Sequence, residues 1–231
     1  MLQAKSLTKT YGEHTALQSL NLTISKGEIF CLLGQNGAGK TTTINLFLGF
    51  TEPSSGSAAI NGLEVKPNDT TTKKHIAYIP EVVMLYGNLS GIENLDFFSR
   101  LAGFKYSAEE LVGFLSHAGL QTAAHEKRVG TYSKGMRQKV GIAIALAKNA
   151  DAIFMDEPTS GLDPKATAEF TESCKDLARQ GKTIFMATHD IFNAVNVGHR
   201  IGIMKEGHLV HTVNTKDISA TALQQLYLET I

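Results

Sequence analysis

The stretch Gly34-Gln35-Asn36-Gly37-Ala38-Gly39-Lys40-Thr41 decides the fold. It follows the apolar run 29–33, whose composition is that of a buried strand, and it precedes the segment 43–48, whose apolar side chains fall on one face of a helix. The helix is expected to start at Lys40, and Gly49 marks its end. A strand, a glycine-rich loop and a helix in this order predict the first unit of an α/β domain.

The same stretch fits the phosphate-loop pattern of Gly, four residues and Gly-Lys-Thr. Glycines let backbone N–H groups turn toward a phosphate, and the helix N-terminus adds its positive dipole end. Lys40 would place its charge on the β and γ phosphates, and the Thr41 hydroxyl would ligate Mg²⁺. The alternative is a glycine-rich turn that only caps a helix, but a chance match has odds on the order of one in a hundred. The nucleotide-binding residues predicted here are Gly34, Asn36, Gly37, Ala38, Gly39, Lys40, Thr41 and Thr42.

Composition excludes several classes of protein. The chain has 231 residues, of which 42% are hydrophobic, enough for a well-formed core. Its 22 basic and 22 acidic residues give no net charge, so no nucleic-acid partner is expected. Two cysteines make no disulfide framework, and the eight histidines show no metal-binding spacing.

The N-terminal residues lack the pattern of a signal peptide, and the longest apolar stretch, 141–147, is far shorter than a membrane span. We therefore expect a cytoplasmic chain that reaches the membrane only through a partner, as a peripheral subunit on the cytoplasmic face.

The remaining pattern predicts one domain over 1–231 with an inserted part. Alternating apolar residues near 20–24, and a hairpin at the run 58–60, which the turn dipeptide Asn61-Gly62 follows, predict an antiparallel β subdomain. Between 84 and 150 the spacing becomes helical, with Ile92, Leu95, Phe98 and Leu101 on one face. After residue 150 the pattern predicts alternating strands and helices again: strands at 152–155 and 183–187, helices near 165–179, 190–197 and from 220, and a hairpin over 201–211. We predict a mainly parallel mixed sheet flanked by helices, formed by 1–83 and 151–231, with a helical subdomain over 84–150.

A second motif carries carboxylates. The strand 152–155 ends in Asp156 and Glu157. Asp156 is placed to hold Mg²⁺ through water, and Glu157, which strand alternation would point to the other side, is the natural base to polarise an attacking water. In isolation the pair would be a solvated strand end, but beside a phosphate loop the catalytic interpretation is favoured.

Three further motifs complete a recognisable set. Ser133-Lys134-Gly135 lies between the two nucleotide motifs, Asp163 follows Glu157 closely, and His189 ends the strand 183–187. In this order the motifs resemble those of the nucleotide-binding subunit of ATP-binding cassette (ABC) transporters over nearly the whole chain. The resemblance implies the phosphate-loop ATPase fold, Mg²⁺-dependent ATP hydrolysis and a head-to-tail dimer with a second nucleotide-binding subunit, expected to be an identical chain.

The resemblance also assigns roles to individual residues. Tyr11 corresponds to the aromatic that stacks on adenine, and His189 to the residue that contacts the γ-phosphate and the attacking water. Ser133 and Gly135 match the signature loop that reaches the nucleotide of the other subunit, and Asp163 matches the loop that links the two sites. Taken alone, Tyr11 would be a partly exposed core aromatic, His189 a strand-end histidine and Ser133 a helix N-cap.

The sequence departs from the family pattern at three positions. Glu81 stands where glutamine usually ligates Mg²⁺ and senses the transport partner, and we expect it to keep that metal role with altered kinetics. Lys134 replaces the commonest glycine of the signature and Met136 the commonest glutamine. Lys134 either adds a charge near a nucleotide or is simply solvated.

The leading hypothesis is a transport ATPase that works with integral membrane subunits, most similar to those of exporters with separately encoded membrane subunits. The apolar segment 82–89 either lines the docking groove for the membrane partner or packs the helical insert. The alternatives are a soluble ABC-type ATPase acting on the ribosome or DNA, and a small kinase. One cassette with neither a charged linker nor a long insertion favours the transporter.

Overall fold

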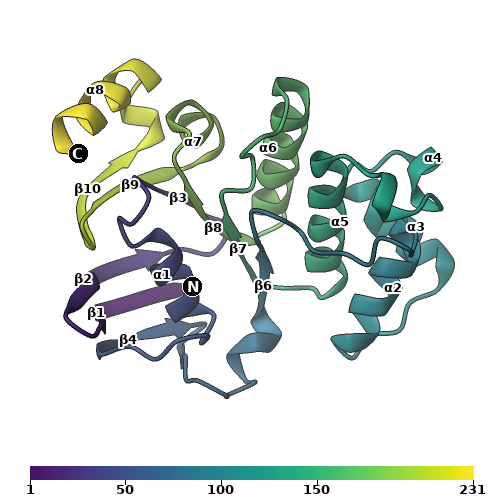
Figure 1. Cartoon of the computed structure of the whole chain (residues 1–231), viewed down its shortest axis with the longest axis horizontal. Helices are drawn as coiled ribbons and strands as arrows, with labels where there is room; N and C mark the ends of the chain where they lie inside the picture. The colour runs from purple at the N-terminus through teal and green to yellow at the C-terminus, as the bar shows by residue number, and fades with distance from the viewer.

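The computed structural model describes all residues, 1–231, and arranges them as two sheets and a helical lobe (Figure 1). The antiparallel sheet has the order β2-β1-β4-β5, and the mixed sheet has the order β10-β9-β3-β8-β7-β6. The strands are β1 (Leu2–Tyr11), β2 (His14–Ile24), β3 (Ile29–Gly34), β4 (Ser55–Ile60), β5 (Leu63–Glu64), β6 (Ile76–Ile79), β7 (Ala152–Asp156), β8 (Thr183–Thr188), β9 (Arg200–Lys205) and β10 (His208–Asn214).

Eight α-helices and three short 3₁₀ turns connect the strands. The α-helices are α1 (Lys40–Phe47), α2 (Gly91–Leu101), α3 (Ala108–His117), α4 (Thr122–His125), α5 (Lys134–Ala147), α6 (Pro164–Arg179), α7 (Ile191–Val197) and α8 (Ala220–Thr230), and the 3₁₀ turns are η1 (Thr72–His75), η2 (Val129–Thr131) and η3 (Thr215–Asp217). None of these helices combines the length and the apolar character that a membrane span requires.

The larger sheet is parallel from β9 through β3, β8 and β7 to β6, and only β10 runs antiparallel, in a hairpin with β9. The fold class predicted from the sequence, a mainly parallel α/β sheet with helices on it and a separate antiparallel β part, is therefore confirmed. The carboxyl ends of the five parallel strands form one edge, which is where loops of α/β proteins hold ligands.

Strand β3 is buried on both faces, and its alternation divides the core in two. Ile29, Cys31 and Leu33 pack with α5, α6, α7 and α8, whereas Phe30 and Leu32 pack between the two sheets around α1. The second core contains an aromatic cluster in which Phe47 of α1 contacts rings from β7 and β8 at centroid distances of 5.6 and 6.1 Å. Helix α1 is thereby fixed against the sheet, and so is the loop that precedes it.

Helices α2–α5 form the lobe at the far end from the N-terminal sheet (Figure 1). Helices α2 and α3 each begin with a capping box, Ser90 with Glu93 and Ser107 with Glu110, which fixes where each helix starts. Leu95 is fully buried, but Leu101, predicted on the same apolar face, is 75% exposed because it lies in the last turn, beyond the helices that cover the middle of α2.

Candidate functional site

The loop 34–41 closes over the carboxyl end of β3 and leads directly into α1. Gly37 and Gly39 have φ of 85° and 106°, conformations that glycine adopts without a Cβ penalty. At Gly39 a Cβ would also lie 2.4 Å from the carbonyl oxygen of Ala16, so the antiparallel sheet presses against the loop there. Glycine at this position is required for both its backbone angle and the close approach.

Lys40 is nearly enclosed, with 6% of its surface exposed. Its Nζ donates to the carbonyl oxygens of Gly34 at 2.6 Å and Gln35 at 3.2 Å, and lies 3.5 Å from Oε1 of Glu157. The ammonium is therefore held inside the curve of the loop, at the position where a phosphate group would meet the backbone N–H groups.

Thr41 and Asp156 meet at the edge of the sheet. The Thr41 hydroxyl donates to Oδ2 of Asp156 at 2.8 Å. Burial raises the pKa of Asp156 above its usual value, and the negative charges of Glu157 and Glu81 act in the same direction, against the hydrogen bond from Thr41 and the charge of Lys40. A carboxylate in these surroundings gains from a cation, and a hydroxyl beside it supplies a second hard oxygen.

Glu157 lies one residue beyond β7 and contacts His189 at the end of β8. Its Oε2 is 2.8 Å from Nδ1 of His189 and accepts a hydrogen bond from the His189 backbone N–H at 3.2 Å. Simple strand alternation, which would point Glu157 away from Asp156, is wrong at this residue. The strand has ended, and φ of Glu157 is 46°, so the left-handed backbone turns its carboxylate into the same cleft.

Lys40, Thr41, Asp156 and Glu157 line one open cleft of about 440 Å³, whereas His189 reaches it only through its contact with Glu157. Tyr11 stands at its rim, 46% exposed, with Nζ of Lys9 4.8 Å from its ring centroid. An exposed ring beside the phosphate loop is free to stack on a flat base. The lining consists of Tyr11, His14, Ala16, Gln35, Asn36, Gly37, Gly39, Lys40, Thr41, Thr42, Glu81, Asp156 and Glu157.

Glu81, the residue that replaces the family's glutamine, contributes to this cleft from the segment after β6. Its Oε1 accepts a hydrogen bond from Ser160 Oγ at 2.9 Å and lies 3.7 Å from Nζ of Lys134. The carboxylate thus lies between the cleft and the start of α5.

Ser133, Gly135 and Asp163 do not line the cleft of their own chain. Ser133 caps α5 by accepting from the Met136 N–H at 3.2 Å, and Asp163 caps α6 by accepting from the Ala166 N–H at 2.9 Å. A Cβ on Gly135 would lie 3.3 Å from that of Ala166, so the two helix starts pack against each other. The three residues form a second polar surface, separate from the phosphate loop.

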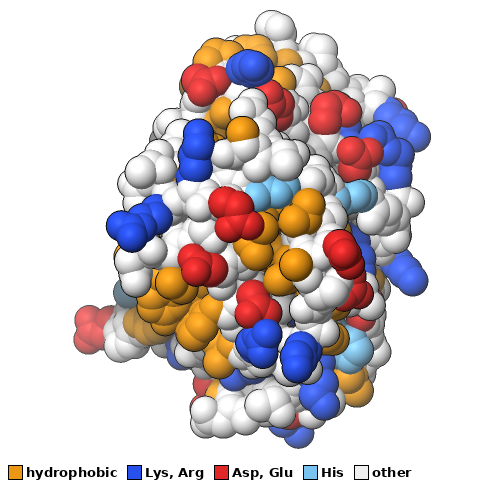
Figure 2. Space-filling model, turned by 90° about the vertical axis from the view of Figure 1, so that its right-hand side faces the viewer, with side chains coloured by type: hydrophobic (Ala, Val, Ile, Leu, Met, Phe, Trp, Pro, Cys, Tyr) orange, Lys and Arg blue, Asp and Glu red, His pale blue; other side chains and the backbone are white.

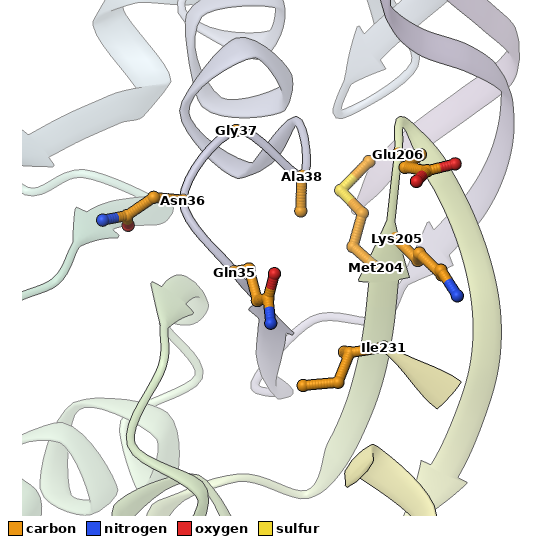
Figure 3. A pocket seen from close by; sticks show the side chains of 8 residues that line it. All are labelled: Gln35, Asn36, Gly37, Ala38, Met204, Lys205, Glu206 and Ile231. Atoms are coloured by element: carbon orange, nitrogen blue, oxygen red, sulfur yellow. The ribbon is translucent and has the colours of Figure 1, made fainter. Parts of the chain in front are cut away.

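A smaller hollow of about 230 Å³ lies on the other side of the phosphate loop, between residues 35–38, the β9–β10 turn and Ile231 (Figure 3). Figure 3 shows that Asn36 points away from this hollow, on the opposite side of the loop. The β9–β10 turn supports the loop directly, because the Gly207 N–H donates to the carbonyl oxygen of Ala38 at 3.0 Å. A Cβ on Gly34 would lie 2.7 Å from the carbonyl oxygen of Met204.

A protein-family model described as ABC transporter matches residues 17–160. The chain belongs to the ABC transporter family. The bacitracin transport ATP-binding protein BcrA of Enterococcus faecalis is 36% identical over 221 residues, which are 94% of this chain and 70% of that ABC protein. The protein named "Probable multidrug ABC transporter ATP-binding protein YbhF" of Escherichia coli (strain K12) is 34% identical over 222 residues, so this chain spans 38% of its length.

A solved ABC structure agrees with this assignment. The dimeric, post-hydrolysis form of the cassette MJ0796 bound to ADP and Pi matches with a TM-score of 0.81 and 31% identity, covering 93% of this chain and 99% of that one.

Sequence reasoning missed some of the residues around the cleft. His14 and Ala16 line it, although they come from the turn and start of β2, far from any motif. Met204 and Gly207 support the loop from the β9–β10 hairpin. The only signal for the latter was the turn dipeptide Glu206-Gly207, which predicted a hairpin but not its contact with the loop.

Proposed function

We propose that this chain is the ATP-binding and ATP-hydrolysing subunit of an ABC transporter, and that it dimerises around two ATP molecules to drive transport, in the export direction, through separate membrane subunits. The observation that carries the proposal is the convergence of Lys40, Asp156 and Glu157 on one cleft whose wall is a phosphate loop. That arrangement combines a phosphate cradle, a metal carboxylate and a base, which are the parts needed for phosphoryl transfer to water.

In this proposal the chain's own residues divide the chemistry. Lys40 and the N–H groups of residues 34–39 bind the β and γ phosphates, and Tyr11 stacks on adenine. Glu157 accepts the proton of the attacking water. His189, 2.8 Å from Glu157, orients that carboxylate and faces the γ-phosphate.

The residues at the strand edge fit a bound Mg²⁺. Thr41 and Asp156 offer adjacent oxygen ligands, and Glu81, which follows the neighbouring strand β6, offers a third. Mg²⁺ keeps several waters and takes further ligands from the phosphates of a nucleotide, so one or two protein carboxylates are enough. When bound, Mg²⁺ would neutralise charge on the phosphates.

The second polar surface supports the dimer. Ser133 and Gly135 lie at the start of α5 and Asp163 at the start of α6, outside their own cleft. We propose that a second, identical chain brings its Ser133 and Gly135 to the γ-phosphate held by this one, and that Asp163 lies at the contact. Residues 84–150 are proposed as the helical subdomain that carries Ser133 and Gly135, and 1–83 with 151–231, which include Asp163, as the ATPase core.

A partly apolar surface supports the membrane partner. Val82, Met84 and Tyr86 are 54%, 78% and 48% exposed, whereas the alternate residues Val83 and Leu85 pack against the core. The segment therefore both packs the insert and leaves every second side chain free. Figure 2, which looks onto the end of the molecule formed by the lobe of helices α2–α5, shows hydrophobic side chains gathered there among charged ones. We propose that the exposed side chains of 82–86 dock cytoplasmic helices of the membrane subunit.

Export is supported by the name of one relative, the Nod factor export ATP-binding protein I of Cupriavidus metallidurans (strain ATCC 43123 / DSM 2839 / NBRC 102507 / CH34), which is 35% identical over 212 residues. The localisation proposed is peripheral, on the cytoplasmic face of the membrane, with no nucleic-acid partner. The soluble ATPase acting on the ribosome or DNA is not favoured by any relative named here.

The test uses tagged Glu157→Gln chain, which should bind Mg-ATP, hydrolyse it slowly and stay dimeric. Purification from detergent-solubilised native membranes with Mg-ATP is expected to recover a multi-span membrane protein. Met84→Asp in the same background should dimerise with ATP but lose that protein, and Lys40→Met should lose the dimer. Recovery of ribosomes or DNA-repair proteins would overturn the transport assignment. Recovery of the membrane protein by Met84→Asp as well would overturn docking through the exposed side chains of 82–86.

A further inference from the structure

Glu81 joins three segments that are far apart in the sequence. Its carboxylate oxygen Oε1 takes both a hydrogen bond from Ser160 Oγ at 2.9 Å and the charge of Lys134 Nζ at 3.7 Å. Ser160 belongs to the loop after β7, and Lys134 is the first residue of α5. A single oxygen atom therefore connects the segment after β6 to the loop that leads to Asp163 and to α5. We call α5 the signature helix, because the signature residues Ser133 and Gly135 lie at its start.

The backbone at Glu81 is held by the same helix. Gln138 is 1% exposed, and its Nε2 donates to the carbonyl oxygens of Glu81 at 3.2 Å and Pro80 at 3.4 Å. Lys134 also lies against the loop, since its Nζ is 3.8 Å from where a Cβ of Gly161 would be. Helix α5 thus contacts both the backbone carbonyl oxygen and the side-chain carboxylate of Glu81.

The same carboxylate faces the nucleotide cleft beside Asp156 and Thr41, where its charge acts on Asp156. The Lys134 ammonium and a cation at Thr41 and Asp156 compete for the single negative charge of this carboxylate and repel each other, so each weakens the interaction of the other with Glu81. Lys134, for its part, does not line the cleft. Any ligand that draws Glu81 into the cleft must weaken its pair with Lys134.

We propose that Glu81 and Lys134 form a nucleotide-sensitive latch, in which the pair holds the signature helix to its own subunit and Mg-ATP binding opens it. Opening leaves Lys134 uncompensated beside Ser133, on the surface proposed to face the second subunit. Glu81 is then a positioning residue as well as a candidate metal ligand. This inference rests on the proposed function of the cleft.

The latch makes a prediction whose sign is opposite to that of simple electrostatics. If Mg-ATP binding must break the ion pair between Glu81 and Lys134, a chain without Lys134 does not have to spend free energy on breaking it, and it binds Mg-ATP more tightly. Loss of a positive charge near an anion would by itself weaken binding. The side chain of Glu81 is 51% exposed and that of Lys134 is 32% exposed. The affinity for Mg-ATP should therefore rise by about 1.4- to 5-fold, which corresponds to the free energies measured for exposed ion pairs.

The experiment measures the affinity of single chains for a non-hydrolysable Mg-ATP analogue. Protein labelled at its N-terminus is kept at nanomolar concentration, too dilute to dimerise, while the analogue is titrated. Lys134→Gln should tighten binding, Lys134→Arg should keep the original affinity, and Lys134→Gln in a Glu81→Gln background should have no effect. The gain should shrink with added salt, since the pair is partly exposed.

Lys165→Gln is the matched control, because Lys165 is 83% exposed and 4.0 Å from its nearest carboxylate, Glu169. It should leave affinity unchanged. Weaker or unaltered binding by Lys134→Gln, or the same gain with and without Glu81, overturns the latch while leaving the proposed function in place. If none of the variants binds Mg-ATP and the unaltered chain does not either, the proposed function fails and the latch fails with it.

Discussion

Replacing Lys40 by methionine should destabilise the fold itself, apart from any loss of nucleotide binding. Lys40 is 6% exposed and donates to two loop carbonyl oxygens. It is also the only cation within 4.0 Å of Glu157 Oε1, an enclosed oxygen that has no hydrogen-bond partner. Methionine keeps much of the length of the side chain but leaves that oxygen buried without a countercharge.

The magnitude follows from how far Glu157 is buried. Removing one partner of a fully buried ion pair costs about 3–5 kcal/mol. Glu157 keeps 15% of its side-chain surface exposed, and its other oxygen stays on His189 at 2.8 Å. An unsatisfied buried group of this kind costs about 1–3 kcal/mol, which in a chain of this size lowers Tm by about 2–12 °C.

The assay is urea and thermal unfolding of Lys40→Met, Glu157→Gln and the double variant, all without nucleotide at pH 7. Glu157→Gln removes the charge that Lys40 compensates, so the double variant should regain at least half of the stability lost by Lys40→Met. Lys165→Met, on the exposed face of α6, should change stability by under about 0.5 kcal/mol. If Lys40→Met lowers the stability of the Glu157→Gln chain as much as that of the unaltered chain, the reasoning is refuted. The lost stability would then come from the hydrogen bonds of Lys40 to the loop.

Three further predictions concern the sheet edge, the cysteines and the loop glycines. Burial raises the pKa of Asp156, so the native chain binds a proton at this carboxyl more readily than the unfolded chain does, and the native chain loses stability as pH rises through that pKa. Asp156→Asn removes the ionisable group and should therefore raise Tm at pH 7 by about 1–4 °C. The gain should disappear when thermal unfolding is repeated below the usual pKa of a carboxyl group. Burial raises the pKa of Cys31 to about 12 and also raises that of Cys174, so a disulfide reagent at pH 8 should label neither thiol in the native chain and both in urea. Gly37→Ala should cost about 1–2 kcal/mol for its positive φ, and Gly39→Ala clearly more in the same unfolding assay, because only there would the Cβ lie 2.4 Å from a carbonyl oxygen.

The features predicted well from the sequence are those encoded by neighbouring residues. Helix α1 begins at Lys40 as predicted, since Gly39, in a left-handed conformation, is its N-cap and the apolar pattern of the helix follows. The turn Asn61-Gly62, with both φ positive, joins β4 and β5 as predicted. Each of these depends on a few adjacent side chains and their backbone preferences.

The features that the sequence did not predict depend on contacts between distant segments. No pattern near Ala16 indicates that its carbonyl oxygen presses on Gly39. The prediction of where the Glu157 side chain points was wrong for a different reason. Side chains alternate only inside a strand, and Glu157 lies one position beyond the end of β7, in a left-handed conformation. The pair of Glu81 with Lys134 required the packing of α5 on the segment after β6.

The order of the strands explains why one edge collects these groups. Across the large sheet the neighbours run β9, β3, β8, β7, β6, all parallel, so the residues that follow them appear side by side. In that order they are the turn at Gly207, the phosphate loop, His189, Glu157 and Glu81. Moving any one strand would separate a neighbouring pair of these residues, whereas lengthening a loop at the opposite edge would not. The chemistry of the cleft therefore depends on strand order first and on individual contacts second. The strained or buried groups at this edge are held in place by the two hydrophobic cores, of 31 and 23 buried residues, rather than by the loops themselves.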